Sequence, residues 1–226
     1  MIRGGETPEA RHPADERATP VAAGRDVDRE ALERVAAGDV EAFRGLVERH
    51  QDRLVAVCQR LLGDREEARD AAQEVFLKAF RKAGDFEPRA QVATWLYRIA
   101  VNHSLNRLRR RRIVRFLPFA AAGGEGGEED APGLDPPDEA ADPEAALASR
   151  LRWRRVRRAI DTLPPGQRAV LVLVRFEGLA YKEAAEVLGI SVGAVESRLV
   201  RGLRNLEAAL AQDSAAAGVP RTRRTR

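Results

Sequence analysis

The chain has 226 residues and a single cysteine, so it cannot form an internal disulfide, and a secreted disulfide-stapled scaffold is excluded. Hydrophobic residues make up 44% of the sequence and aromatic residues only 5%, which favours helices packed on helices over aromatic-rich sheets. The formal net charge is +4, but basic and acidic residues are segregated along the chain, and this segregation is more informative than their sum.

Metal, membrane and catalytic functions find little support in the sequence. The three histidines, His12, His50 and His103, are scattered and no cysteine pair accompanies them, so no metal site is expected. No apolar run approaches the ~18 residues of a membrane span, and the N-terminus lacks the apolar core of a signal peptide. There is no nucleotide-binding glycine loop and no nucleophile–base pair. The sequence therefore predicts a cytoplasmic, non-enzymatic protein with no cofactor, no catalytic residues and no membrane insertion.

The chain opens with residues 1–26, which are rich in Pro, Gly, Arg and Glu and are predicted to form a disordered leader. Residues 27–113 form the first predicted domain and contain almost no proline. Within it, Gly38 separates a short helix from a longer one, whose apolar residues between Phe43 and Leu62 are spaced for one buried face. Two further helices follow after short loops, so a four-helix bundle is expected.

The third helix of this domain is predicted to open with a capping pair, Asp64 and Glu67, and to end near Gly84. Val75 and Ala79 continue the buried stripe. The remaining positions form an amphipathic face that is available to a partner, although periodicity alone names no partner. The polar and apolar residues of this face are Asp70, Gln73, Glu74 and Leu77.

The fourth helix begins near Gln91 and runs into a strongly basic stretch. Seven arginines and no acidic residue occur at 98–115. An exposed helix without compensating acids repels itself, so a polyanionic partner is expected, with a solvated basic helix end as the alternative. One helix face combines arginine with asparagine, a mixture that suits the reading of base edges better than pure phosphate neutralisation. The residues that share this face are Arg98, Asn102, Asn106 and Arg109.

Residues 114–148 are predicted to form a flexible acidic linker, because their Gly, Pro and acidic residues are too polar to bury a core. Residues 149–211 form the second predicted domain, and residues 212–226 form a basic tail. Pro164 and the proline after it divide two helices of the second domain. The apolar run 169–176 is expected to be helical, since no nearby segment could pair with it as a strand.

The clearest local pattern lies between Tyr181 and Leu206. Gly189 permits a sharp turn, because positive φ is cheap only for glycine, and Ser191 is suited to cap the helix that follows. Small residues line the helix before the turn, and an apolar stripe continues along the helix after it. This arrangement is typical of a helix-turn-helix, whose second helix enters the major groove, with an ordinary helical hairpin as the alternative.

The outward face of that second helix is rich in arginine, which binds phosphates or pairs with guanine edges. We expect Ser197, Arg198 and Arg201 to contact bases or phosphates of the DNA, and Arg204 to contact the DNA backbone. Glu196 fits this face only if its carboxylate accepts a hydrogen bond from a cytosine amino group, because phosphates repel it.

Together, these stretches resemble the extracytoplasmic-function branch of the sigma-70 family. The segments similar to sigma region 2 are Gly38 to Phe43, Leu61 to Asp64, Asp70 to Phe80 and Thr94 to Asn102. The segments similar to region 4 are Leu163 to Arg168, Phe176 to Leu179, Gly189 to Ser191 and Ser197 to Leu199. The resemblance implies an all-α protein of two small domains, the region 2 four-helix bundle and the region 4 helix-turn-helix, joined by the acidic linker.

The resemblance also implies a function and its surfaces. The chain would direct core RNA polymerase to promoter DNA and promote DNA opening, with an anti-sigma factor as a further partner. The residues implied to bind the clamp helices of the polymerase β′ subunit are Asp70, Gln73, Glu74, Leu77 and Lys78. Those implied to recognise and open the −10 element are Phe86, Arg89, Gln91, Arg98, Asn102, Asn106, Arg109 and Arg110. Those implied to read the −35 element are Ser191, Glu196, Ser197, Arg198, Arg201 and Arg204.

The polymerase β flap is an additional implied contact of the complex. The alternative is a two-domain helix-turn-helix regulator whose first domain senses a ligand and which binds operator DNA without polymerase. Binding to core polymerase distinguishes the two hypotheses.

Overall fold

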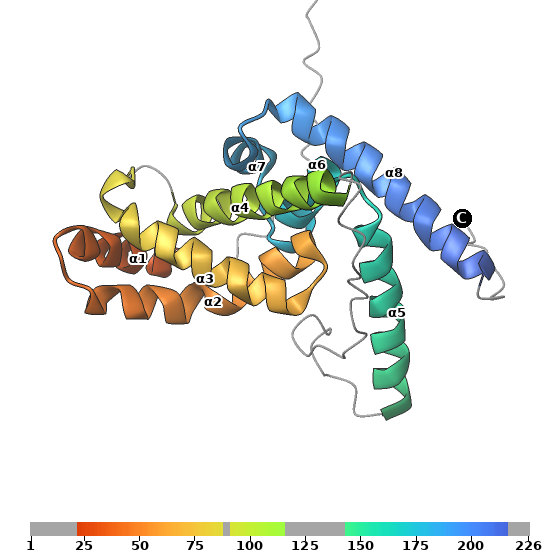
Figure 1. Cartoon of the computed structure of the whole chain (residues 1–226), viewed down its shortest axis with the longest axis horizontal. Coiled ribbons are helices and arrows are strands. Elements are labelled where there is room, and N and C mark those ends of the chain that lie inside the picture. The colour runs from red at the N-terminus through yellow and green to blue at the C-terminus, as the bar shows by residue number, and fades with distance from the viewer. Residues whose placement is uncertain (1–21, 88–90, 116–142, 217–226) are drawn as a thin grey trace, which may run out of the picture.

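The computed structural model describes residues 22–87, 91–115 and 143–216, and within these ranges every regular element is a helix (Figure 1). The expectation of an all-α fold is therefore confirmed. Most of the predicted leader, most of the linker, the end of the tail and Arg89 lie outside the described residues. The elements are α1 (Ala22–Ala36), α2 (Glu41–Leu62), α3 (Arg65–Arg81), the 3-10 turn η1 (Ala83–Asp85), α4 (Val92–Arg115), α5 (Pro143–Asp161), α6 (Pro165–Leu171), the π-helix η2 (Val172–Phe176), α7 (Tyr181–Leu188) and α8 (Val192–Ala216).

Helices α1 to α4 form the first unit, and local chemistry sets their ends. Gly63 adopts φ 81°, and its N–H donates to the Gln59 carbonyl, which terminates α2. The Asp64 carboxylate accepts from the Glu67 N–H at 2.8 Å and so caps α3. Between the helices lies a core of fully buried aliphatic side chains, each contributing about 1.5–3 kcal/mol when removed from water. Its largest members are Leu32, Leu46, Leu54, Leu61, Leu96, Val57, Val75 and Val101.

Helices α5 to α8 and η2 form the second unit. Pro165 occupies the first turn of α6, where its missing N–H costs nothing. The apolar run is helical as expected, but its second half winds as a π-helix, and the Glu177 N–H donates to the Val172 carbonyl five residues earlier at 3.0 Å. Gly189, at φ 62°, makes the turn between α7 and α8, and the Ser191 hydroxyl accepts from the Ala194 N–H at 3.2 Å. The helix-turn-helix and its cap are therefore present.

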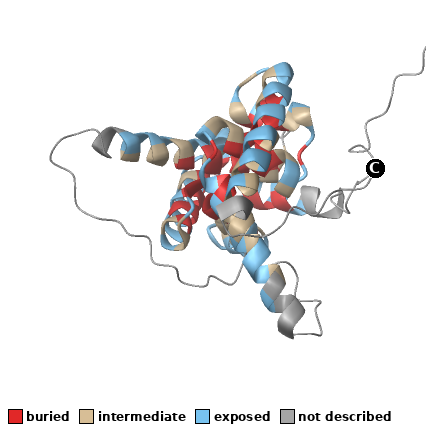
Figure 2. Cartoon of the chain, turned by 90° about the vertical axis from the view of Figure 1, so that its right-hand side faces the viewer, coloured by how far each residue is buried: buried red, intermediate tan, exposed pale blue. Residues whose placement is uncertain are grey.

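The two units pack against each other and share one continuous hydrophobic core (Figure 2). Helix α4 lies beside α7, and α2 contacts α5 and α6. By contrast, the outer parts of α5 and α8 extend away from the body of the molecule (Figure 1). The sequence predicted two domains connected through a linker, and nothing in its local patterns indicated this direct packing.

Candidate nucleic-acid and polymerase interfaces

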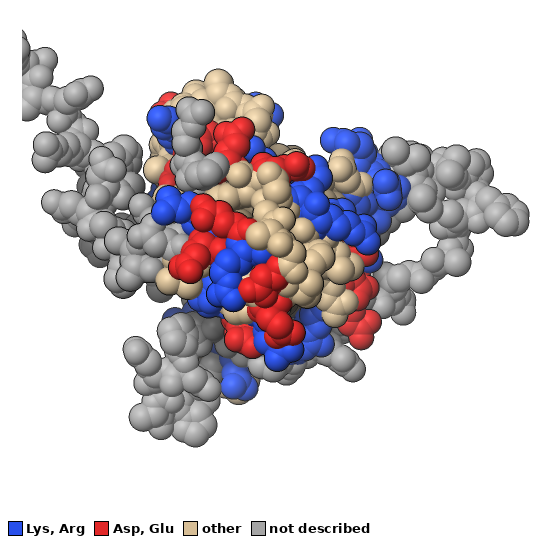
Figure 3. Space-filling view, turned by 90° about the vertical axis from the view of Figure 1, so that its left-hand side faces the viewer, with Lys and Arg blue, Asp and Glu red and all other residues tan. Residues whose placement is uncertain are grey.

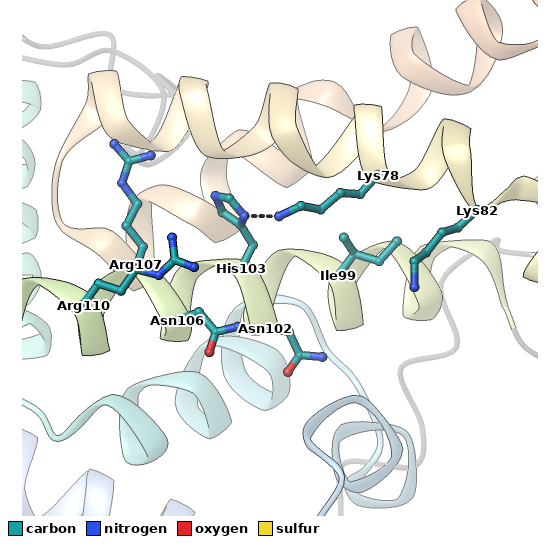
Figure 4. Close-up of a pocket in the computed structure, with 8 residues that line it drawn as sticks. All are labelled: Lys78, Lys82, Ile99, Asn102, His103, Asn106, Arg107 and Arg110. Atoms are coloured by element: carbon teal, nitrogen blue, oxygen red, sulfur yellow. Dashed lines mark hydrogen bonds between the residues drawn. The ribbon is translucent and has the colours of Figure 1, made fainter.

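A cationic cavity lies between α3 and α4 (Figure 4). Its volume is about 480 Å³. The lining consists of four cationic side chains, two asparagines, a histidine and an isoleucine, with no carboxylate among them. These residues are Lys78, Lys82, Ile99, Asn102, His103, Asn106, Arg107 and Arg110. Such a lining attracts phosphate and offers amides that can both donate to and accept from a base.

The predicted −10 face of α4 is exposed along its length. Arg98, Asn102, Asn106 and Arg109 are all solvent-exposed, and Arg109 donates to the Asn106 side-chain oxygen at 3.0 Å. This contact leaves the Asn106 amide nitrogen available as a donor. Exposed Arg110 borders the cavity and lies close to this face.

The expectation of an uncompensated arginine helix is wrong in part. The carboxylate of Glu67, on α3, lies 3.6 Å from Arg107 Nε and forms an ion pair with Arg111. An acid on a neighbouring helix therefore balances arginines that have no acidic neighbour along the chain. The main-chain N–H of Glu67 donates to the Asp64 cap of α3, and its carboxylate pairs with the arginines of α4 and so links the two helices.

The residues predicted in the −10 loop have packing roles as well. The Phe86 ring meets the Trp95 ring edge-on, with centroids 5.4 Å apart, and so anchors the loop to α4. The Gln91 amide donates to Glu183 of α7 at 3.2 Å. Gln91 thus touches the second unit in this arrangement.

The outer face of α3 carries four of the five residues predicted for polymerase binding. Asp70, Gln73 and Glu74 are exposed, and Leu77 is 50% exposed. Next to this face, Gln73 borders a groove of about 600 Å³ between α2 and α3, which the sequence patterns did not reveal. The α2 residues that line the groove are Val47, Gln51, Asp52, Val55, Ala56 and Gln59.

Lys78 lies elsewhere. Its ammonium group donates to His103 Nδ1 at 2.5 Å across the α3–α4 cavity (Figure 4). Burial, together with the nearby Lys78 charge, holds the pKa of His103 below its usual value. His103 is therefore a neutral acceptor, and Lys78 belongs to the cationic cavity and not to the outer face of α3.

The end of the molecule that carries α1 has no single dominant charge. Figure 3 shows basic and acidic side chains interspersed there around a strip of uncharged residues. Within the first unit, the cationic cavity is consequently a better candidate for a polyanion than this end face.

The predicted −35 residues all lie on α8 or at its cap. Ser191, Glu196, Ser197, Arg201 and Arg204 are exposed. Arg201 folds back on its own helix, where it donates from Nη2 to the Ser197 hydroxyl at 3.0 Å and from Nε to the Ser197 carbonyl at 3.2 Å.

Two other polar residues of α8 pack on α6. The Arg198 guanidinium lies over Gly166, so that a methyl group at that glycine would be 3.6 Å from Nη1. Asn205 is exposed on α8, and its side-chain amide donates to the Gln167 side chain of α6 at 2.8 Å. These contacts fix the orientation of α8 relative to α6.

A buried carboxylate joins the two units. Glu177 follows η2, and its side chain is only 3% exposed. It accepts from Arg53 Nε at 2.8 Å, from Arg60 Nη1 at 3.1 Å and from the Tyr97 hydroxyl at 2.9 Å. We call these four residues the Glu177 cluster. No local sequence signal could have found it, because the partners lie 80 to 124 residues before Glu177.

Two further observations concern the described ranges only. None of their helices is long and apolar enough to cross a membrane. They also hold no group of three or more His, Cys, Asp or Glu side chains arranged to bind a metal ion.

Comparison with known proteins identifies both units. Residues 46–113 match the family Sigma-70 region 2, and residues 153–206 match the family Sigma-70, region 4. The ECF RNA polymerase sigma factor SigW of Bacillus subtilis is 34% identical over 175 residues, covering 76% of this chain and 90% of SigW. The RNA polymerase sigma-H factor of Pseudomonas aeruginosa is 36% identical over 187 residues, covering 82% of this chain and 95% of that factor.

Among solved structures, CnrH in complex with the cytosolic domain of CnrY is similar in fold. The TM-score is 0.58 at 30% sequence identity, and the similarity covers 84% of this chain and all of the compared one. Both units of the present chain thus have counterparts in the same order in known proteins.

Proposed function

The chain belongs to the extracytoplasmic-function sigma factors of the sigma-70 family, and on that basis we propose which of its surfaces perform each step of transcription initiation. As a sigma factor, it directs core RNA polymerase to promoters and promotes DNA opening. The relatives match across both units, which disfavours a regulator that uses the helix-turn-helix alone. Because the chromosome and polymerase of bacteria share the cytoplasm, we place its action there.

The cationic cavity is proposed to capture the opened −10 element. Asn102 and Asn106 would read base edges, while Lys82 and Arg110 would hold phosphates. Unstacking a base costs a few kcal/mol, and stacking plus hydrogen bonds return about 1–3 kcal/mol per base, so a few captured nucleotides with their phosphate contacts offset the cost of opening. This cavity is the single observation that best supports the assignment.

The N-terminal half of α8 is proposed to lie in the major groove of the −35 element. There the Arg201 guanidinium donates a hydrogen bond to the Ser197 hydroxyl, and this contact holds the arginine in place at the surface. Arg204, further along the helix, is placed to contact the backbone.

The outer face of α3 is proposed to bind the polymerase β′ clamp helices through Asp70, Gln73, Glu74 and Leu77. The adjoining α2–α3 groove gives this face the concave, partly apolar shape that receives a helix. Lys78 is reassigned to the −10 site, because it faces the cationic cavity. The second unit is the proposed partner of the β flap.

An anti-sigma factor is proposed as a regulator of this chain. The support comes from CnrH, which is similar in fold and was solved together with the cytosolic domain of CnrY.

In vitro transcription with core polymerase tests the function directly. On a promoter that the protein recognises, we expect Asn102→Ala to lower open-complex formation on the order of tenfold, the loss of one base contact. Its binding to core polymerase should stay unchanged, since Asn102 lies away from the outer face of α3. Normal promoter opening by this variant would remove Asn102 from the −10 site, and failure of the wild-type protein to bind core polymerase would refute the function itself.

A further inference from the structure

The contact between Lys78 and His103 lies within the cationic cavity, and the proposed −10 site gives His103 no role. Lys78 Nζ is 2.5 Å from His103 Nδ1, and the two side chains point toward each other from α3 and α4 (Figure 4). The other ring nitrogen, Nε2, is buried and has no hydrogen-bond partner within the described residues. Nδ1 is therefore the ring nitrogen that a molecule entering the cavity can reach.

The charges around this pair favour an anion. Three further cations line the same cavity, and no carboxylate does. Burial is the main cause that lowers the pKa of His103, and the charge of Lys78 lowers it further. The charged groups that act on the ring come from both helices, and the one carboxylate among them raises its pKa; these groups are Lys78, Glu74, Arg107 and Arg110. Without a ligand, His103 consequently stays neutral in a cavity full of positive charge.

A phosphate oxygen can replace the lysine as the partner of the ring. Hydrogen bonds from charged nitrogens to phosphate are about 2.7–2.9 Å long, so an oxygen that binds both groups must lie between Lys78 Nζ and His103 Nδ1. The 2.5 Å separation of these nitrogens leaves no room for it. The lysine side chain has a flexible four-carbon stem and can withdraw, whereas the half-buried ring keeps its position.

Withdrawal of Lys78 changes the chemistry of His103. The Nδ1 lone pair, which accepts from the ammonium group in the free protein, becomes available to a proton from the solvent. The charge of the phosphate stabilises the imidazolium that forms. Both side chains then donate to the same phosphate, Lys78 from Nζ and His103 from Nδ1.

We propose that Lys78 and His103 together bind a backbone phosphate of the opened −10 strand, and that His103 takes up one proton as this phosphate enters the cavity. The proposal rests on the proposed −10 function of the cavity. It adds His103 to the residues that contact DNA, and it gives Lys78 a different partner in the free and in the bound protein.

The direction of the pH effect follows from this proton uptake. Because the phosphate raises the pKa of His103, the DNA-bound protein holds more protons than the free protein, and affinity rises as the pH falls between the two pKa values. If the phosphate restores the ordinary histidine pKa of about 6.5, binding becomes about threefold tighter at pH 6.0 than at pH 7.5.

Binding of single-stranded DNA to the holoenzyme tests the pair. The probe is a rhodamine-labelled oligonucleotide with the −10 sequence of a promoter that the protein recognises, titrated by fluorescence anisotropy at pH 7.5 and 6.0 and constant ionic strength. Calorimetry at pH 6.5 in two buffers of different ionisation enthalpy counts the protons taken up on binding. His103→Gln keeps an acceptor for Lys78 but cannot take up a proton. Lys82→Gln is the matched control, because it removes a cavity cation one turn further along α3.

The wild type is expected to bind about threefold more tightly at the lower pH and to take up part of a proton at pH 6.5. His103→Gln should bind like the wild type at pH 7.5, and its affinity should gain much less as the pH falls. Lys82→Gln should bind more weakly at both pH values and keep the threefold ratio. Lys78→Gln tests the pair from the other helix: without the ammonium group, His103 is protonated more readily before DNA arrives, so proton uptake on binding should shrink.

Failure of the pair and failure of the proposed function give different results. If Asn102→Ala weakens binding of the oligonucleotide, but the wild type and His103→Gln show the same affinity ratio and the same proton uptake, the phosphate pair is overturned and the −10 cavity stands. If Asn102→Ala binds the oligonucleotide like the wild type, the cavity is not the −10 site and both proposals fall.

Discussion

The ammonium group of Lys78 lies 2.5 Å from Nδ1 of His103, although the two residues are on different helices. Lysine can only donate, so the histidine accepts at Nδ1 and carries its proton on Nε2. This contact separates Lys78 from its neighbour in sequence, Leu77, which points to solvent on the outer face of α3. Adjacent residues on one helix therefore serve two different surfaces.

Leu77→Ala and Lys78→Ala should consequently impair different steps, polymerase binding and promoter opening. Leu77→Ala is expected to weaken binding to core polymerase by about 1–2 kcal/mol as an apolar contact is lost. It should change the free energy of unfolding by no more than about 0.5 kcal/mol. Lys78→Ala should leave polymerase binding intact and reduce promoter opening. Binding to labelled core polymerase and permanganate footprinting of the promoter give the two readouts, and equal effects of both variants on polymerase binding would contradict the division.

Arg201→Ala should weaken protection of the −35 element in the holoenzyme. A lost phosphate contact lowers affinity for all sequences and reduces the slope of log affinity against log salt by about 1, whereas a lost base contact costs about 1–3 kcal/mol at one position only. A salt titration on two promoters that differ at one −35 base separates these cases. Ser197→Ala serves as a companion, since it frees the guanidinium without removing it.

Glu67→Gln should destabilise the first unit by about 1 kcal/mol, because it weakens the link between α3 and the arginines of α4. The Asp64 cap stays in place, since it uses the main-chain N–H of residue 67. Urea unfolding at low and high salt provides the measurement. The difference between variant and wild type should shrink as salt rises, and a difference that does not depend on salt would argue against an ionic link.

Lowering the pH should destabilise the protein through His103. Burial and the Lys78 charge lower its pKa in the folded state, so the unfolded chain binds the proton more readily. Above the ordinary histidine pKa of about 6.5, His103 is neutral in both states and its neutral form stabilises the fold fully. As the pH falls below 6.5, the unfolded chain takes up the proton first, and the free energy of unfolding decreases until the pH reaches the lower pKa of His103 in the folded protein. Unfolding measured at pH 7.5 and 5.5 should show a smaller loss for His103→Gln than for the wild type. An identical loss in both would show that other groups account for the pH dependence.

Periodicity and the placement of glycine and proline were sufficient to predict the helices and the helix-turn-helix. They succeeded because Gly63, Gly189 and Pro165 set helix ends through local backbone chemistry. The exposed faces of α3, α4 and α8 followed from the same spacing. Their roles in promoter and polymerase binding remain predictions.

Sequence spacing could not predict the contacts between segments that are far apart along the chain. Glu67 meets arginines about 40 residues away along the chain, and Glu177 meets Arg53 at a separation of 124 residues. A carboxylate in a local pattern looks like a solvated helix position, and only the tertiary fold distinguishes a buried partner from an exposed charge. Lys78 shows the same limit, because helix spacing does not say which neighbouring helix a long side chain will reach.

The π-helix at Val172–Phe176 sets the direction in which Glu177 points. Each residue of an α-helix turns the chain by about 100°, and a π turn contains one residue more than an α turn. If the same residues wound as an ordinary α-helix, the one residue that the π turn accommodates would add its rotation of about 100°, and the carboxylate would turn away from Arg53. Deleting one residue, such as Val174, would remove that surplus as the segment rewinds and would leave Glu177 facing the first unit. The way the halves of the protein meet therefore depends on the winding of this segment, even with every charged side chain retained.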